Sequence, residues 1–72
     1  MLTKEMLEAI NLLRDENLVW SSDMEDIKED LANLILVCAA QNEMMQFLAG
    51  NMAKKILYSG KGANYSPQLE TR

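Results

Sequence analysis

The sequence predicts an all-α protein: a helical hairpin that assembles into a homo-oligomeric helical bundle. Three observations predict it. Apolar residues recur at helical spacing along most of the chain. The second predicted helix carries more apolar surface than the first, shorter one could cover. With one Cys and no His, neither an internal disulfide nor a Cys/His zinc site can stabilise the 72 residues, so association is the remaining means.

A short first helix is expected over about residues 3–16. The Thr3 hydroxyl can accept a hydrogen bond from one of the free backbone N–H groups at its start. The helix then places one apolar stripe on a single face. This stripe consists of Met6, Ala9, Ile10 and Leu13. Asn17 would put a polar residue on the same stripe, and the aperiodic residues after it indicate a turn.

A long second helix is expected over about residues 23–58. Ser22 and Glu25 have the spacing of a capping box, in which each side chain accepts a hydrogen bond from the backbone of the other residue. The residues of one stripe are then spaced alternately three and four apart, which is a heptad repeat over about four heptads. The stripe consists of Met24, Ile27, Leu31, Leu34, Cys38, Gln41, Met45, Leu48, Met52 and Lys55.

Gly50-Asn51 is the point where this long helix can be kinked or broken, although the heptad repeat continues through it. The chain after Tyr58 has neither helical period nor apolar density. We therefore expect residues 1–58 to form a single helical domain and residues 59–72 to form a flexible C-terminal tail.

A Met-rich stripe in the second half of the long helix is the first candidate for recognition. Because methionine adapts its shape to a partner, this stripe can fill the core of a homo-oligomer or accept another protein. Its members are Met44, Met45, Phe47, Leu48 and Met52. Trp20, in the turn between the helices, either closes the open end of the hairpin or is an exposed anchor for a partner.

An acidic cluster at the start of the second helix is the second candidate. It consists of Asp23, Glu25, Asp26, Glu29 and Asp30. Three interpretations remain open: a solvated helix start favoured by the helix dipole, a face that docks on a basic partner, and a cation site. Residues 1–36 carry a net charge of −6 and residues 37–72 of +2, so direct binding to nucleic acid is not expected.

Catalysis and membrane insertion have little support in the sequence. There is no His for acid–base work, no Ser with an activating partner and no Gly-rich phosphate loop, so we expect neither an enzyme nor a cofactor or metal. Cys38 is expected to be a small buried apolar residue. The longest apolar run, Leu34–Ala40, is seven residues, too short to span a membrane, and a cytoplasmic protein is expected.

The sequence thus predicts a small non-enzymatic binding protein that acts, like an inhibitor or adaptor, by occupying a partner macromolecule's surface. Its partners are expected to be its own copies and another protein. The alternative is an oligomeric binder of a small anionic ligand such as a nucleotide, because cations and tyrosines gather toward the C-terminus. The residues concerned are Lys54, Lys55, Tyr58, Lys61 and Tyr65.

Overall fold

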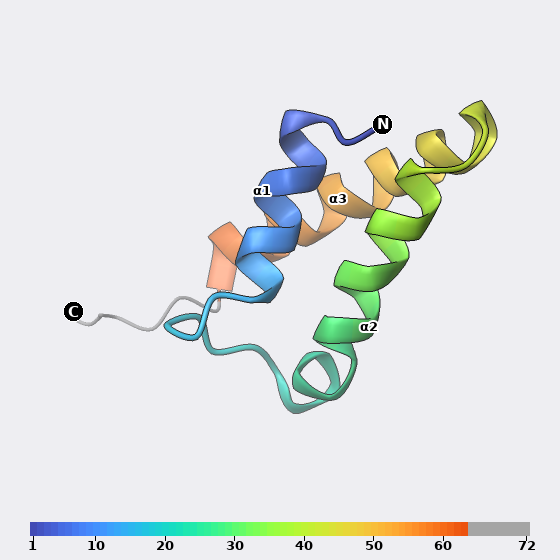
Figure 1. Ribbon diagram of the computed structural model, residues 1–72. Coiled ribbons are helices and arrows are strands. Elements are labelled where there is room, and N and C mark those ends of the chain that lie inside the picture. Colours follow the sequence, from blue (N-terminus) through green and yellow to red (C-terminus); the bar gives the residue numbers. More distant parts are fainter. Residues whose placement is uncertain (64–72) are drawn as a thin grey trace.

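The computed structural model describes residues 1–63, with side chains up to Ser59, and over this range the chain is all-helical, as predicted. Three helices follow in order: α1 (Lys4–Leu13), α2 (Ser22–Ala39) and α3 (Glu43–Ala63). α1 and α2 lie next to each other, and α3 packs behind both of them (Figure 1). Every pair of helices is in contact, so the core lies where the three meet.

The core combines a few large side chains with many small ones. Leu13, Leu18 and Ile35 are the largest fully buried side chains. Five alanines distributed over the three helices are also buried, which lets the helices approach closely. They are Ala9, Ala32, Ala39, Ala49 and Ala53. Cys38 is buried among these residues with a free thiol, as its apolar surroundings in the sequence predicted.

α1 follows the sequence prediction at its start and over its length. The Thr3 hydroxyl accepts a hydrogen bond from the Met6 N–H at 3.1 Å, and every member of the predicted apolar stripe is buried. The helix ends at Leu13, not near residue 16. The Asp15 carboxylate accepts a hydrogen bond from the Asn17 N–H at 2.9 Å, and this local turn replaces another turn of helix.

The single long second helix predicted from the heptad repeat is wrong, because α2 ends at Ala39 and α3 begins at Glu43. The Asn42 carboxamide accepts a hydrogen bond from the Met45 N–H at 3.0 Å and thus caps α3. The Gln46 side chain donates to the Gln41 carbonyl at 2.9 Å. This turn folds α3 back over α1 and α2, so the chain covers apolar residues that a straight helix would leave exposed.

The helix continues through Gly50-Asn51, the alternative breakpoint, without interruption. α3 extends to Ala63, so residues 59–63, which were predicted to belong to the tail, are helical. The rest of the predicted tail lies outside the described residues.

The start of α2 also differs from the predicted capping box by one residue. Ser21 is the N-cap, and its hydroxyl accepts from the Met24 N–H at 3.4 Å, whereas Ser22 is the first helical residue. The Glu25 carboxylate accepts from the Trp20 N–H at 3.3 Å. Ser21 and Glu25 therefore still bind backbone donors at this end, but they are four residues apart and not in the three-residue spacing of the box.

Candidate functional site

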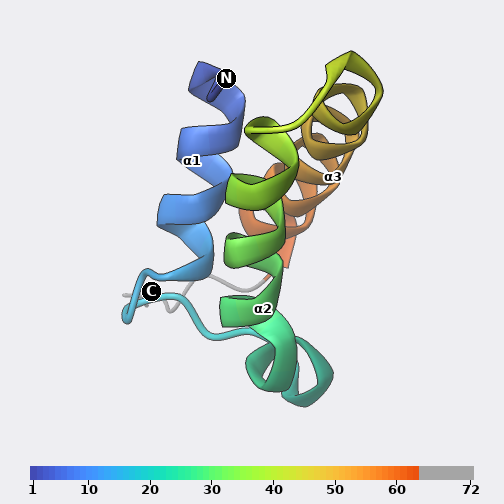
Figure 2. The same cartoon turned by 45° about the vertical axis from the view of Figure 1, so that its right-hand side comes forward.

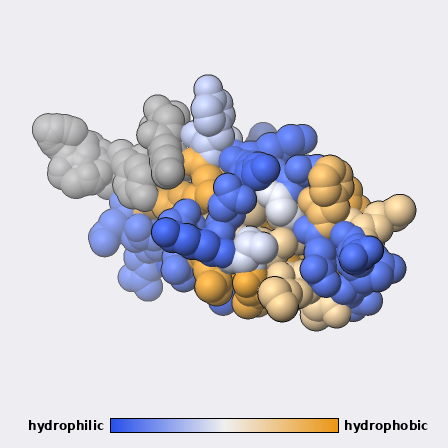
Figure 3. Space-filling model, turned by 90° about the horizontal axis from the view of Figure 1, so that it is seen from above, coloured by the Kyte–Doolittle hydropathy of each residue, from blue (hydrophilic) through white to orange (hydrophobic). Residues whose placement is uncertain are grey.

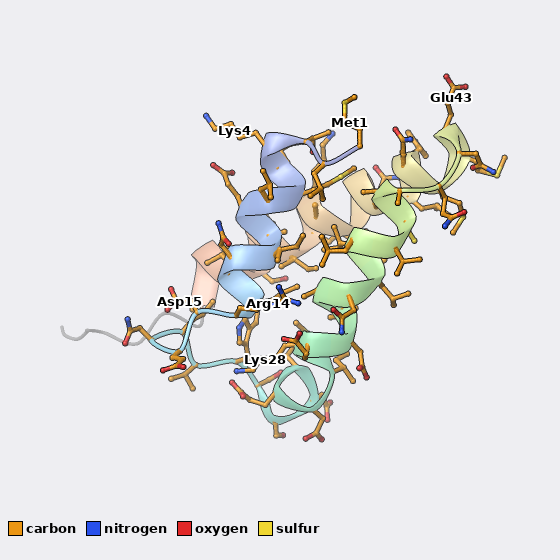
Figure 4. The ribbon with its side chains drawn as sticks, in the orientation of Figure 1. Met1, Lys4, Arg14, Asp15, Lys28 and Glu43 are labelled. Carbon is orange, nitrogen blue, oxygen red and sulfur yellow. The ribbon has the colours of Figure 1, made fainter. Side chains whose placement is uncertain are left out.

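An ion pair fixes one side of α2 against α1. The Arg14 guanidinium, at the end of α1, reaches toward α2 (Figure 4) and donates to both carboxylate oxygens of Glu29, at 2.8 and 3.2 Å. It also donates to the Asn33 carboxamide at 3.2 Å. Glu29 and Asn33 are four residues apart, so they define the side of α2 that faces α1.

The other side of α2 is apolar and exposed. Ile27 and Leu34 are seven residues apart and lie on one helical stripe. Ile27 is two residues from Glu29, which places it on the side of the helix away from Arg14 because successive residues are about 100° apart. Val37, three residues beyond Leu34 and four beyond Asn33, lies between this stripe and the side that faces α1. All three side chains are about half exposed.

α3 has the same two-sided character. Gly50 lies against α1: a Cβ at this position would be 4.0 Å from Cε of Met6. Leu48 is two residues away and therefore projects from the opposite side of the helix, away from α1. Met44 is one turn before Leu48, and it is 73% exposed.

These two exposed stripes lie on α2 and α3, which are next to each other and are joined by the turn at residues 40–42 (Figure 2). We refer to them as the outer apolar face. It consists of Ile27, Leu34, Val37, Met44 and Leu48. Seen from above, apolar side chains also reach the surface among polar ones at the end of the molecule that carries this turn (Figure 3). Monomeric proteins rarely expose contiguous apolar patches larger than a few hundred Å².

Only part of the predicted Met-rich stripe belongs to the outer apolar face. Met44 and Leu48 do, whereas Met45 and Met52 are half-buried against the core. Phe47 is 68% exposed but lies on the α1 side, where it lines an open hollow of about 370 Å³ together with Thr3. The five residues therefore do not form one surface, because α3 turns their different sides toward different neighbours.

Three residues of the outer apolar face were not predicted as site residues from the sequence: Ile27, Leu34 and Val37. The first two were assigned to the core of a continuous helix, in which a neighbouring chain would bury them. The signal that could have found them is Asn42, a favourable N-cap residue followed by Glu43. A break there folds the chain back and leaves these three residues on the outside.

The acidic cluster is exposed on the first turns of α2. Glu25 pairs with Lys28 at 2.9 Å, and Glu29 pairs with Arg14. The hydrogen bond from Lys28, and after it the one from the Trp20 backbone, lower the pKa of Glu25 below its ordinary value of 4.5. The three aspartates of the cluster, Asp23, Asp26 and Asp30, form no ion pair within the described part of the chain.

Trp20 cannot be an exposed anchor, because only 3% of its surface is accessible. It belongs to the core cluster, which agrees with the other prediction, that it closes the end of the hairpin. Its indole N–H is buried and has no acceptor among residues 1–59. Burial of the apolar ring system thus outweighs the cost of leaving the indole N–H without a hydrogen bond.

The predicted anion site is only partly assembled. Lys54 and Tyr58 line a second open hollow, of about 230 Å³, with Glu5 and Leu57. The Glu5 carboxylate would repel an anion there. Lys55 lines neither this hollow nor the one beside Phe47. The side chain of Lys61 and the whole of Tyr65 lie outside the described part of the structure.

Within residues 1–63, no three Cys, Asp or Glu side chains are grouped closely enough to hold a metal ion. None of the helices in this range is long and apolar enough to cross a membrane.

Over the described residues 1–63, the fold and surface define the class of the protein as a small three-helix protein with an exposed apolar face on α2 and α3. Comparison with known proteins does not narrow this class. The chain matches no protein-family model, no curated protein and no solved structure.

Proposed function

We propose that this protein is a non-enzymatic interaction protein and that the outer apolar face is its protein-binding surface. One observation carries the proposal: five large apolar side chains on two neighbouring helices, α2 and α3, are each at least 43% exposed. An isolated exposed apolar residue is ordinary, but a concentration of them on one side of a small domain is typical of an interaction site. The homo-oligomer and the inhibitor-like or adaptor-like action expected from the sequence are part of this proposal.

The packing of the helices supports a binding role for this face. Buried residues from all three helices hold α2 and α3 in place, so a partner need not order the outer apolar face. The acidic cluster at the exposed start of α2 can favour partners of opposite charge. The free, buried Cys38 fits the cytoplasmic location expected from the sequence.

The proposal is tested by photo-crosslinking in the cells that make the protein. A photoreactive phenylalanine analogue replaces Leu48 in one variant and Phe47 in a matched control, since the two neighbouring side chains project from different sides of α3. We expect a crosslink to protein, either a second copy or another chain, from position 48 and much less from position 47. Equal yields from both positions, or none from position 48, would contradict the proposal.

A further inference from the structure

We propose that a second copy of this chain covers the outer apolar face, with α2 of each copy lying across α3 of the other. This inference rests on the proposed function, because it names the partner of the same surface. It starts from the charged residues that lie beside the outer apolar face on α2 and α3.

The exposed stripe of α2 changes character along its length. Asp26 and Asp30 lie near the start of the helix, and Leu34 and Val37 follow toward the turn at residues 40–42. The residues succeed each other by three or four positions, so they share one side of the helix. The stripe is therefore apolar beside the turn, whereas at its start Asp26 and Asp30 flank the exposed Ile27.

The stripe of α3 has the complementary pattern. Met44 and Leu48 lie near the turn, and Lys55 lies seven residues beyond Leu48 on the same side. Among the described residues, the ion pairs are Arg14–Glu29 and Lys28–Glu25, so Lys55 and the aspartates are not paired with each other in the monomer. The stripe is apolar at the turn and basic at the far end.

The turn places these features at matching heights. α2 and α3 run in opposite directions from residue 41, and each advances about 1.5 Å per residue. Leu34 and Leu48 are each seven residues from residue 41, and Lys55 is as far from it as residue 27. The apolar ends of both stripes thus lie beside the turn, and the charged residues of each stripe lie toward the end of the helix that is away from the turn.

A two-fold dimer can join two such faces in two ways. If α2 packs on the partner's α2 in antiparallel orientation, the aspartates lie on apolar side chains and lose water without gaining a partner. If α2 packs across the partner's α3, apolar ends meet apolar ends. Asp26 and Asp30 then lie opposite the partner's Lys55, twice in each dimer. Charge complementarity selects the second arrangement.

The outer apolar face also has the residue types of a protein–protein interface. Stable interfaces bury about 800 Å² on each partner, with an apolar centre and a polar rim. The five apolar side chains of the face would form the apolar centre, and the charged residues that border them would form the polar rim. A contact that is complementary to itself is the usual basis of a two-fold dimer, whereas a different protein would have to match both charged ends independently.

The test is sedimentation equilibrium of the full 72-residue chain over a wide concentration range. We expect a reversible monomer–dimer equilibrium. Leu48→Asp should raise the dimer Kd by about 100-fold or more, since it puts a charge at the apolar centre. Lys55→Glu should raise the dimer Kd about tenfold, because it faces two aspartates of the partner.

Lys54→Glu is the matched control for Lys55→Glu. It makes the same change in net charge one residue away, on the side that lines the hollow with Glu5, and should alter the dimer Kd less than about threefold. Asp30→Lys alone should also weaken the dimer, and combining it with Lys55→Glu should restore most of the affinity. Rescue by this pair, but not by Asp30→Lys with Lys54→Glu, supports α2 lying across the partner's α3.

Three results would overturn the inference: a monomer at every concentration, an oligomer larger than a dimer, or a dimer that responds equally to Lys54→Glu and Lys55→Glu. Helical circular dichroism of each variant excludes loss of fold as the cause. The proposed function is judged separately, because a monomer that crosslinks to another protein from position 48 retains it, whereas a monomer without that crosslink loses both.

Discussion

Residues of the same kind are buried on one side of α2 and exposed on the other. Ile35 is 0% exposed and packs in the core, whereas Leu34, the next residue, is 47% exposed on the outer apolar face. Both lie in the most apolar segment of the chain, and nothing in their own chemistry separates them. Their different environments come from α1 and α3, which cover one side of α2 and leave the other open. Burial here is decided by helix placement and not by hydrophobicity.

The two sides of α2 should differ most in how much a truncated side chain lowers the free energy of unfolding. Ile35→Ala removes a fully buried side chain and should lower the free energy of unfolding by about 2 to 4 kcal/mol. Leu34→Ala should lower it by less than about 1 kcal/mol, because the side chain is already half in water and alanine favours helix. Urea denaturation at low protein concentration, where association contributes little, gives both values. Similar losses for the two variants would mean that Leu34 is also covered in the monomer.

A smaller effect, of opposite sign, is expected on the closed side of α3. Gly50 lies in the helix without positive φ, and a Cβ there would meet only Met6, at ordinary van der Waals distance. Gly50→Ala should therefore raise the free energy of unfolding by about 0.5 to 1 kcal/mol through helix propensity. The same denaturation assay measures it. A destabilised variant would show that α1 and α3 approach more closely in solution than in this structure.

The smallest effect concerns Glu25, an exposed residue in the first turn of α2. Because the folded-state pKa of Glu25 is lowered, its carboxylate adds stability above pH 4.5, and this contribution is lost as the pH falls through the lowered value. Glu25→Gln should reduce the melting temperature slightly at neutral pH and not at all in strong acid. The exposed position keeps the effect small. Melting curves across this pH range check it, and a difference that grows toward acid would contradict the assignment.

The sequence predicted those parts of the fold that depend on neighbouring residues. Thr3 caps α1, the apolar stripe of α1 is buried, and Cys38 is buried, because local spacing and composition determine each of them. The site was predicted only in part. Met44 and Leu48 were selected, but their grouping with Phe47 assumed one uninterrupted helix.

The parts that were not predicted depend on competition between distant contacts. The heptad repeat from Met24 to Lys55 fits a long helix as well as two shorter ones, and periodicity cannot distinguish them. The turn at residues 40–42 is favoured because it lets α3 contact both other helices. Trp20 is similar: its sequence position allowed burial or exposure, and only the packing of the neighbouring helices decides.

The five buried alanines have a consequence for how this chain can evolve. They let the helices pack closely, and the backbone spans only 15 Å along its shortest axis. A larger side chain at any of these five positions would separate two helices but would not make room for any further side chain. The chain can therefore gain interior only by sharing a surface with another chain, and mutations that add apolar groups to the outer apolar face are the ones its architecture can accommodate.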